Sequence, residues 1–256
     1  MSNRRSEQML IPNPELEVLL PVHNEAESIE RTVREICGEL SPRLRFQFII
    51  TEDGSVDDTR GILTRLSQSI PMKLIMSPTR KGYAPAVTDG MKQLEAPYLL
   101  CLDSDGQCDP KDFWKFWDSR QECEVLIGWR VHRKDPFARR FLSRGFHAVY
   151  QAIYNIPIHD PSCPFVLARR EVVEQLVPEL GAMREGLWWE FAARARRHRF
   201  RIKELPINHR ERLAGKTRVY NPTKLPGIAR RHIIALLKIW WGTRSASRAP
   251  GESGQG

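Results

Sequence analysis

The residues of this sequence that could do chemistry gather in short polar strings that directly follow apolar runs. The clearest string is Cys101-Leu-Asp103-Ser-Asp105-Gly-Gln107, where an apolar run leads into two aspartates one residue apart. Two such carboxylates can face one hard cation, which prefers oxygen ligands and commonly bridges to a substrate diphosphate. A plain turn is the alternative, because Asp, Ser and Gly are themselves turn residues.

A second string, which runs from Thr51 to Thr59, follows an earlier apolar run. In it, Asp53 could accept hydrogen bonds from the imino and hydroxyl groups of a nucleoside, and Gly54 permits a tight turn. Asp57 and Asp58 are expected to cap the helix that comes next.

A third string, Pro21-Val-His23-Asn24-Glu25, ends the first apolar run. Here a helix cap supplied by Asn24 is the alternative explanation, and His23 could equally be a half-exposed ring without a ligand. Three polar strings at three strand ends are nevertheless difficult to attribute to three independent turns.

The pattern of apolar runs predicts the elements that must position these strings. Strands are expected at 16–22, 45–51, 72–76, 98–102 and 124–129, with helices at 29–40, 57–69 and 85–94 and another starting at Asp109-Pro110. Further on we expect helices at 138–154, 170–177 and 185–197, strands at 165–168 and 201–208, and a helix from 222. Such alternation predicts an α/β fold with a mostly parallel sheet, in which ligands bind beyond the carboxyl ends of the strands.

Composition narrows the class of protein. A chain of 256 residues with 41% hydrophobic and 28% charged residues is not collagen-like, coiled-coil or wholly disordered. The five cysteines show no metal-binding spacing, and their odd number and scattered positions favour a reduced, cytosolic chain over a disulfide framework. The polar N-terminus predicts no signal peptide, and no apolar stretch approaches the ~20 residues that a membrane span needs.

Charge is distributed unevenly along the chain. Residues 1–128 hold 15 Lys/Arg and 21 Asp/Glu, whereas residues 129–256 hold 25 and 10, and the net charge is +9. The acidic half could hold a cation, and the basic half could meet nucleic acid, phosphate or anionic lipid.

The C-terminal region is expected to form an amphipathic helix over 222–242 with basic and aromatic anchors, Arg230, Arg231, Trp240 and Trp241. Contact with a membrane surface is the favoured account, and packing on the domain or on a second chain is the alternative. The organisation we expect is a flexible N-terminus (1–14), one catalytic domain (15–221), this helix and a disordered tail (243–256).

Eight strings resemble those of the family-2 inverting glycosyltransferases, in particular the dolichol-phosphate mannose synthase-like branch: P-V-H-N-E, E-D-G-S-V-D-D-T, K-G-Y-A-P-A-V, D-S-D-G-Q-C-D-P, I-G-W-R, A-R-R-F-L-S-R-G, D-P-S-C-P-F-V-L-A-R-R-E and L-P-I-N-H-R-E-R-L-A-G-K-T-R. The resemblance covers about residues 15–240. It implies a glycosyltransferase A-type fold with a Rossmann-like sheet, Mg²⁺ or Mn²⁺, a GDP- or UDP-linked sugar as donor and a polyprenyl phosphate as acceptor.

The same resemblance implies roles for individual residues. By this resemblance the metal and the diphosphate are bound by Asp103, Ser104, Asp105 and Gln107, and the metal ligands are Asp103, Asp105 and Gln107. The nucleoside pocket falls to Pro21, His23, Glu25, Thr51 and Asp53. The donor phosphates fall to Arg130, Arg212 and Arg218, the acceptor phosphate to Arg139 and Ser143, and Asp160 lies close to the sugar. The sequence departs from the family at His23, at Cys163-Pro164 and at Lys216, and it lacks the C-terminal membrane helices of some relatives.

The function we expect is metal-dependent inverting transfer of a mannose- or glucose-type hexose to a polyprenyl phosphate at the cytoplasmic face of a membrane, with Asp103, Asp105, Asp160 and Arg130 as catalytic residues. The leaving diphosphate gains negative charge, which a cation and arginines can stabilise. A phosphate acceptor needs no strong base.

Three alternatives or additions accompany this expectation. A soluble hydroxyl acceptor would need a base, for which Asp160 or the acceptor-side Glu190 is the candidate. A nucleic-acid binder would suit the isoelectric point of about 9.6, but no base-reading motif supports it, so no nucleic acid is expected. A homo-oligomer is possible in either case.

Overall fold

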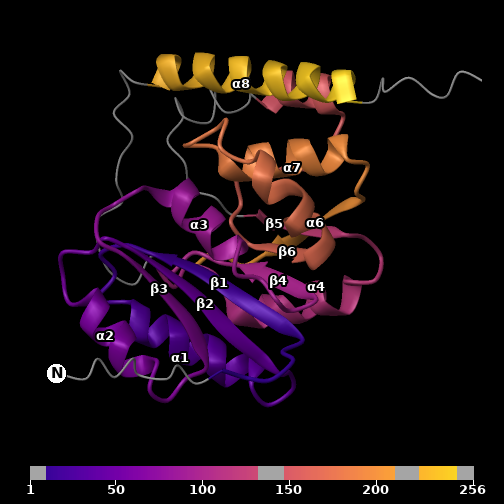
Figure 1. Cartoon of the computed structure of the whole chain (residues 1–256). Coiled ribbons are helices and arrows are strands. Elements are labelled where there is room, and N and C mark those ends of the chain that lie inside the picture. The colour runs from indigo at the N-terminus through magenta and orange to yellow at the C-terminus, as the bar shows by residue number, and fades with distance from the viewer. Residues whose placement is uncertain (1–9, 132–146, 211–224, 247–256) are drawn as a thin grey trace, which may run out of the picture.

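A seven-stranded sheet forms the centre of the chain in the computed structural model, which describes residues 10–131, 147–210 and 225–246 (Figure 1). In spatial order its strands are β3 (Met72–Ser77), β2 (Phe46–Asp53), β1 (Leu16–Val22), β4 (Tyr98–Cys101), β6 (Val166–Arg169), β5 (Val125–Arg130) and β7 (Ile202–Ile207). β1 pairs parallel with β2 and β4, β2 with β3, and β5 with β7, whereas β6 is antiparallel to both its neighbours. The predicted mostly parallel α/β sheet is confirmed.

Helices cover the sheet on both faces. They are α1 (Ile29–Leu40), α2 (Thr59–Leu66), α3 (Tyr83–Met91), α4 (Phe113–Ser119), α6 (Arg170–Leu176) and α7 (Leu187–Arg197), with short 3-10 turns at η1 (Pro110–Asp112) and η2 (Val177–Glu179). α1 and α2 lie on one face of β1–β3 and α3 lies on the other (Figure 1). Every residue of β1 and β2 is buried, as expected for parallel strands covered from both sides.

Several element boundaries differ from the sequence-based expectation. β2 continues through Asp53, and α3 begins at Tyr83 because Gly82 turns the chain with a φ of 106°. The cap at Asp109 is confirmed, since its side chain accepts a hydrogen bond from the backbone N–H of Lys111 and Pro110 follows. Residues 147–154 are helical, and the earlier part of that expected helix lies outside the described residues.

The C-terminal helix α8 (Leu225–Ala246) extends past the expected end at residue 242, into the segment for which disorder was expected. Figure 1 shows α7 between α8 and the sheet. The inner face of α8 buries Ala235, Leu236 and Ile239, and the hydroxyl of Tyr154 donates to the carbonyl of Leu236 at 2.6 Å. Within the described segments, no helix combines the length and the apolar character needed to cross a membrane.

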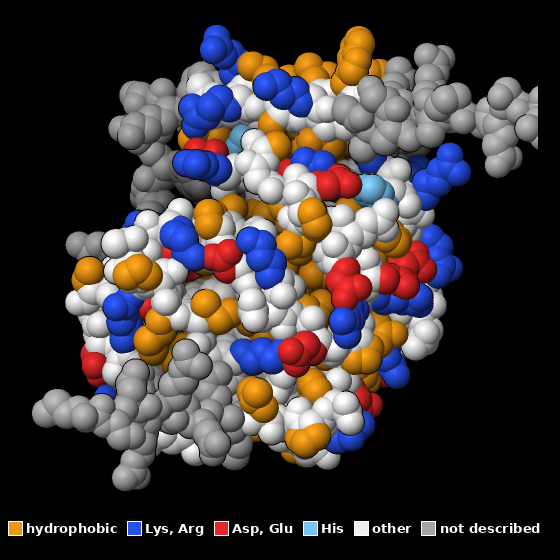
Figure 2. All heavy atoms as spheres, viewed as in Figure 1, with side chains coloured by type: hydrophobic (Ala, Val, Ile, Leu, Met, Phe, Trp, Pro, Cys, Tyr) orange, Lys and Arg blue, Asp and Glu red, His pale blue; other side chains and the backbone are white. Residues whose placement is uncertain are grey.

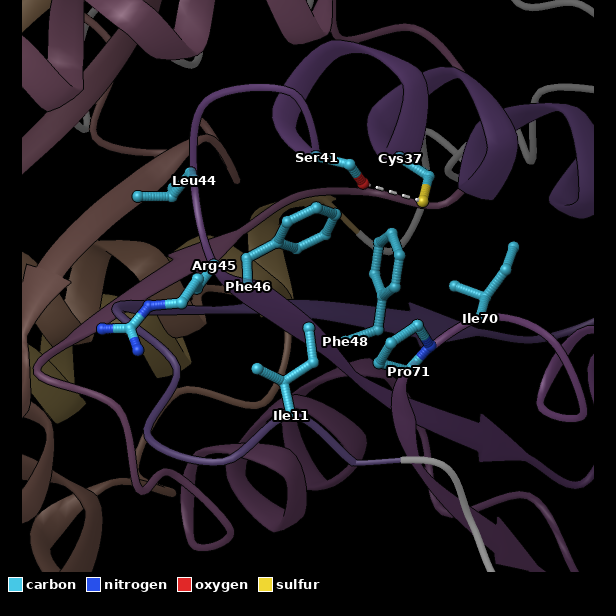
Figure 3. A pocket seen from close by; sticks show the side chains of 9 residues that line it. All are labelled: Ile11, Cys37, Ser41, Leu44, Arg45, Phe46, Phe48, Ile70 and Pro71. Atoms are coloured by element: carbon cyan, nitrogen blue, oxygen red, sulfur yellow. Dashed lines mark hydrogen bonds between the residues drawn. The ribbon is translucent and has the colours of Figure 1, made fainter.

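An apolar cavity of about 190 Å³ lies at the amino end of β2 (Figure 3). Its lining is formed by Ile11, Cys37, Ser41, Leu44, Arg45, Phe46, Phe48, Ile70 and Pro71. Because the polar strings follow the carboxyl ends of the strands, this cavity lies at the opposite end of the sheet from them. All five cysteines are free thiols.

Glu17 is a fully buried carboxylate in the middle strand of the parallel half of the sheet. It accepts hydrogen bonds from the Gln47 amide at 2.7 Å and from the backbone N–H groups of Glu95 and Ala96 at 2.6 and 3.0 Å, and it pairs with Lys73 at 2.8 Å. Burial alone would raise the pKa of Glu17, but these partners outweigh it and lower the pKa below 4.5. The charge therefore holds the turn before β4 against β1.

Replacing Glu17 with Gln leaves buried donors without their charged acceptor, so we expect Glu17→Gln to lower the free energy of unfolding by about 2 kcal/mol at pH 7. Because the folded pKa lies below the unfolded value of about 4.5, the wild-type advantage is complete above pH 4.5 and is lost as the pH falls through the folded pKa. Urea unfolding at pH 7 and at lower pH measures both effects. Glu15→Gln is the control, since the Glu15 side chain is 46% exposed. A loss that did not shrink in acid would contradict this account.

Candidate active site

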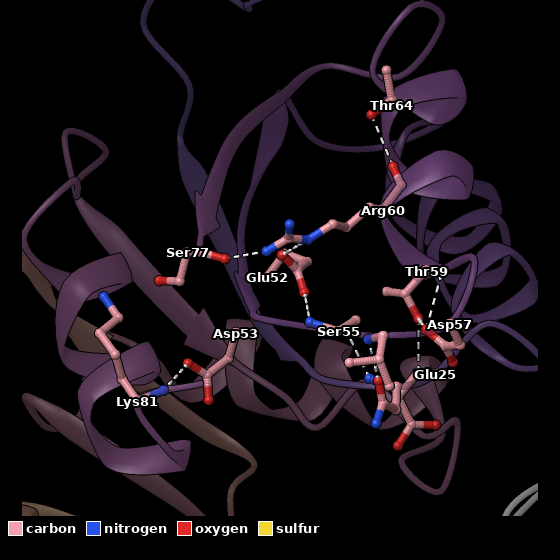
Figure 4. A network of polar contacts seen from close by, with 12 residues as sticks. Glu25, Glu52, Asp53, Ser55, Asp57, Thr59, Arg60, Thr64, Ser77 and Lys81 are labelled. Atoms are coloured by element: carbon pink, nitrogen blue, oxygen red, sulfur yellow. Dashed lines mark hydrogen bonds and ion pairs between the residues drawn. The ribbon is translucent and has the colours of Figure 1, made fainter. Parts of the chain in front are cut away.

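The loops after β1 and β2 are joined into one polar platform (Figure 4). The backbone N–H of Asn24 donates to the Ser55 hydroxyl at 2.9 Å, and the Asn24 side chain accepts from the N–H of Val56 at 2.9 Å. The N–H of Glu25 donates to the Thr59 hydroxyl at 2.9 Å. Asn24 is therefore not the cap of α1, whose N-cap is Ser28. Two polar strings that are separate in the sequence form a single surface.

Asp57 and Asp58 were both expected to cap α2, but only the Asp57 side chain does so, although Asp58 stands at the N-cap position. The Asp57 carboxylate accepts from the N–H of Thr59 at 3.1 Å and from the N–H of Ala26 at 3.2 Å, so it supports the start of α2 and the β1 loop together. Asp58 makes no capping hydrogen bond and instead pairs with Arg65 at 3.1 Å.

Asp53 ends β2 and binds the loop before α3. Its two carboxylate oxygens accept from the N–H groups of Lys81 and Gly82 at 2.7 and 2.8 Å. The backbone of this loop lies against Gly54 (φ 67°), where a Cβ atom would sit 2.4 Å from the nitrogen of Arg80. Each carboxylate oxygen has a second lone pair, so Asp53 can hold the loop and still accept from a ligand.

Glu52 is a buried carboxylate to which the sequence analysis gave no role. It accepts a hydrogen bond from the N–H of Ser55 and pairs with Arg60 at 2.7 Å, and Arg60 also donates to the carbonyl of Ser77 (Figure 4). These contacts tie the end of β2 to α2 and to the end of β3. The sequence offered one signal for Glu52, namely its position between Thr51 and Asp53, which were both predicted for the nucleoside pocket.

Pro21 and Thr51, predicted for the nucleoside pocket, lie opposite each other on β1 and β2, and both are buried. The Thr51 hydroxyl and the Nδ1 atom of the half-buried His23 are buried polar atoms without a hydrogen-bond partner in the described structure. Unpaired buried polar atoms are rare in native proteins, and a ligand is one way to satisfy them. Thr51 lies on β2 and His23 directly follows β1, and the ends of these two strands form the platform.

Asp103 and Asp105 follow β4, which is the neighbour of β1. The Tyr83 hydroxyl donates to Oδ1 of Asp103 at 3.0 Å and accepts from the indole N–H of Trp188 at 2.9 Å. Burial raises the pKa of Asp103 to about 6, and the charge of Asp105 adds to the rise. The hydrogen bond from Tyr83 and the charge of Arg130 oppose this shift without cancelling it.

The segment after the two aspartates is held by the chain that follows β7. The Gln107 side-chain nitrogen donates to the carbonyl of Arg210 at 3.2 Å and lies 3.4 Å from Nε2 of His209. The N–H of Arg210 donates to the carbonyl of Gln107 at 2.8 Å, and the backbones of Cys108 and His209 pair in an isolated antiparallel β-bridge. The predicted ligand Gln107 is thus anchored by its nitrogen, which leaves its amide oxygen as the end that can face a cation. His209 was not among the residues predicted for the site.

Arg130 and Asp160, both predicted to be catalytic, form a partly buried ion pair. Arg130 binds both carboxylate oxygens of Asp160, at 2.7 and 2.9 Å, and donates to the Ser162 hydroxyl at 2.8 Å. Ser162 in turn donates to Asp160 at 2.7 Å. A carboxylate held by a two-pronged arginine is a weak base.

Glu190, predicted on the acceptor side, is not brought to the platform. Glu190 is fully buried, and its carboxylate accepts from the N–H groups of Gly181, Ala182 and Met183 and from Arg194. This is a structural role in the turn before α7, so the structure does not support Glu190 as an acceptor contact or a base. Arg139, Ser143, Arg212, Arg218 and Lys216 lie outside the described residues.

The donor chemistry of this edge fits a hard divalent cation. Asp103 and Asp105 offer carboxylate oxygens and Gln107 an amide oxygen, and the raised pKa of Asp103 indicates that a positive charge would be favourable there. Across the described residues, no three His, Cys, Asp or Glu side chains are arranged to hold a metal by themselves. Mg²⁺ is commonly bound by one or two carboxylates together with substrate phosphates and waters, which is the kind of site these residues can form.

Comparison with known families places residues 17–177 in the profile described as glycosyl transferase family 2. Dodecaprenyl-phosphate galacturonate synthase of Rhizobium johnstonii is 26% identical over 246 residues, which cover 91% of this chain and 69% of that protein. Dolichol-phosphate mannosyltransferase of Pyrococcus furiosus is 27% identical over 235 residues, covering 88% of this chain and 64% of that protein. Parts of both relatives therefore have no counterpart in the alignment.

Solved structures share the fold at low sequence identity. Glucosyl-3-phosphoglycerate synthase from Mycobacterium tuberculosis, in complex with Mn²⁺, UDP and glucosyl-3-phosphoglycerate, superimposes with a TM-score of 0.64 at 18% identity, covering 90% of this chain and 80% of that one. A mannosyltransferase from Pyrobaculum calidifontis in complex with GDP-mannose and Mn²⁺ gives a TM-score of 0.56 at 15% identity, covering 97% and 80%.

Proposed function

Because this glycosyltransferase belongs to family 2, we propose that it moves a mannose- or glucose-type hexose from a GDP- or UDP-linked donor to a polyprenyl phosphate, with a divalent cation held at Asp103 and Asp105. The reaction would take place at the cytoplasmic face of a membrane. The observation that carries the proposal is the half-buried pair Asp103 and Asp105 directly after β4, where the Tyr83 hydroxyl holds Asp103 at 3.0 Å. Burial, together with the charge of Asp105, raises the pKa of Asp103 to about 6 there.

The platform supplies the binding surface for the nucleoside. Among the described residues, the Thr51 hydroxyl and Nδ1 of His23 have no hydrogen-bond partner, and Asp53 binds the N–H groups of Lys81 and Gly82 in the loop before α3. Backbone N–H groups and hydroxyls of such a surface can bind the base and the ribose of a nucleoside.

The second half of the chain supplies charge for the leaving group. A divalent cation, when bound, supplies Lewis acidity and a template for the diphosphate. The charge of Arg130 acts on Asp103 and opposes the rise of the Asp103 pKa. Asp160 fixes the orientation of the Arg130 guanidinium. A guanidinium fixed in advance stabilises the negative charge that develops on the diphosphate without having to reorganise.

A phosphate acceptor agrees with the state of the two carboxylates that could have acted as bases. Asp160 is bound by Arg130, and Glu190 is occupied by backbone donors and Arg194. Transfer to a hydroxyl needs a group that removes a proton, whereas an ionised phosphate is already a nucleophile. The names of the two relatives above include a polyprenyl phosphate, which supports the same acceptor for this chain.

Contact with a membrane surface would be made by the outer face of α8. Ile234, Leu237 and Trp241 are 44, 46 and 71% exposed there, and Arg230 and Lys238 are exposed beside them. Figure 2 shows hydrophobic and basic side chains next to each other along the edge that α8 forms. Aromatic and apolar side chains combined with basic ones suit an anionic lipid surface. The inner face packs on the domain, as the alternative account of this helix expected, and the membrane contact that we propose concerns the outer face alone.

We expect Asp103→Asn and Asp105→Asn each to lower donor turnover by about 100-fold or more at saturating Mn²⁺, because each removes a charged oxygen ligand. Turnover is measured with a panel of GDP- and UDP-linked hexoses and a polyprenyl phosphate. The control is Asp118→Asn, which changes an exposed aspartate on α4. Full activity of either variant would overturn the proposal. A product on a hydroxyl acceptor, with none on the lipid phosphate, would overturn the acceptor alone.

Replacing both Leu237 and Trp241 with Ser should weaken binding to anionic vesicles by about 10-fold or more, since burial of each side chain in the lipid interface contributes to affinity. Sedimentation with phosphatidylglycerol vesicles measures the change. Leu10→Ser is a matched control, because Leu10 is 48% exposed at a site away from α8. Unchanged vesicle binding by the double variant would exclude this face, and loss of a dimer instead would assign it to a second copy.

A further inference from the structure

Tyr83 is the first residue of α3 and lies between the two halves of the chain. Its hydroxyl donates to Oδ1 of Asp103 at 3.0 Å and accepts from Nε1 of Trp188 at 2.9 Å. Trp188 stands 105 residues further along the chain, in the first turn of α7. The contact is therefore a tertiary one that depends on the whole fold.

The segment that carries Tyr83 also binds the end of β2. The N–H groups of Lys81 and Gly82, the two residues before Tyr83, donate to the carboxylate of Asp53. The segment 81–83 thus binds two carboxylates. Its backbone binds Asp53 at the end of β2, and the side chain of Tyr83 binds Asp103 after β4. A displacement of this segment would be felt at both strand ends.

Trp188 is held more firmly than Tyr83. The Trp188 side chain is 5% exposed and packs edge to face on Phe191 with ring centres 5.7 Å apart. The turn before α7 is fixed in addition by the buried Glu190, which accepts three backbone N–H groups. Tyr83 is 39% exposed, so its ring alone is not fixed by burial. The rigid partner in this chain of hydrogen bonds is the indole.

We propose that Tyr83 is a positioning residue for Asp103, and that Trp188 orients Tyr83 for this purpose. The inference rests on the proposed function, because it concerns the carboxylate assigned to the cation. The hydrogen bond from the Tyr83 hydroxyl to Oδ1 fixes how the Asp103 carboxylate is rotated. The other oxygen, Oδ2, does not receive this hydrogen bond. Partners that orient a ligating carboxylate commonly change metal affinity or activity 10- to 100-fold when they are removed.

The test measures cation binding directly, by titrating Mn²⁺ into the substrate-free protein and following the electron paramagnetic resonance signal of the free ion. Tyr83→Phe keeps the ring and removes the hydroxyl, and we expect it to weaken Mn²⁺ binding by about 10-fold. Trp188→Phe should weaken it by a smaller factor, because Tyr83 keeps its hydroxyl but loses its orientation. In turnover, the Mn²⁺ concentration for half-maximal rate should rise by a similar factor in Tyr83→Phe, with kcat at saturating Mn²⁺ changed less than about threefold.

Trp114→Phe is the matched control, because the Trp114 indole donates to Glu39 at 2.7 Å, away from the aspartate pair. It removes a hydrogen bond of the same kind and should leave Mn²⁺ binding unchanged. Equal Mn²⁺ affinity of Tyr83→Phe and the wild type would overturn the inference, as would an equal loss in Trp114→Phe. If the wild type itself bound no Mn²⁺, with or without a nucleoside diphosphate, the proposed function would fail instead.

Discussion

Two like charges held close together in a poorly solvated place are the constraint on which this structure depends. Asp103 and Asp105 follow β4 with one residue between them, and burial together with their mutual repulsion raises the pKa of Asp103 to about 6. Tyr83 and Arg130 relieve only part of that cost. A site that remains unfavourable for a carboxylate after its protein partners are counted is favourable for an added positive charge.

The fold keeps this arrangement in place by bringing distant segments to one edge. Parallel pairing places the ends of β2, β1 and β4 side by side, and hydrogen bonds between the loops join the first two ends. The second half of the chain adds Trp188 from α7 and the Arg130–Asp160 pair. The acidic half thus holds the carboxylates, and the basic half supplies the arginine beside them, which agrees with the charge division along the sequence.

Local signals in the sequence were sufficient for the mostly parallel α/β sheet and for placing the polar strings at the carboxyl ends of its strands. β1 and β2 appear as short apolar runs, and the Asp109-Pro110 cap depends on neighbouring residues alone. Partners far apart in the sequence were not predictable in this way. Asn24 resembled a cap of the next helix but binds the β2 loop, and Glu190 resembled a reactive carboxylate but holds the turn before α7. The bond between Tyr83 and Trp188 has no local signature, because it exists only when α3 and α7 have docked.

The most direct measurement of the central claim is calorimetric titration of the protein with GDP and UDP, in the presence and absence of Mn²⁺. If the aspartate pair holds a cation that carries the diphosphate, one of these nucleotides will bind at least about 100-fold more tightly with Mn²⁺, and by linkage Mn²⁺ will bind more tightly by the same factor with that nucleotide. Nucleotide affinity that does not depend on Mn²⁺ would contradict the account.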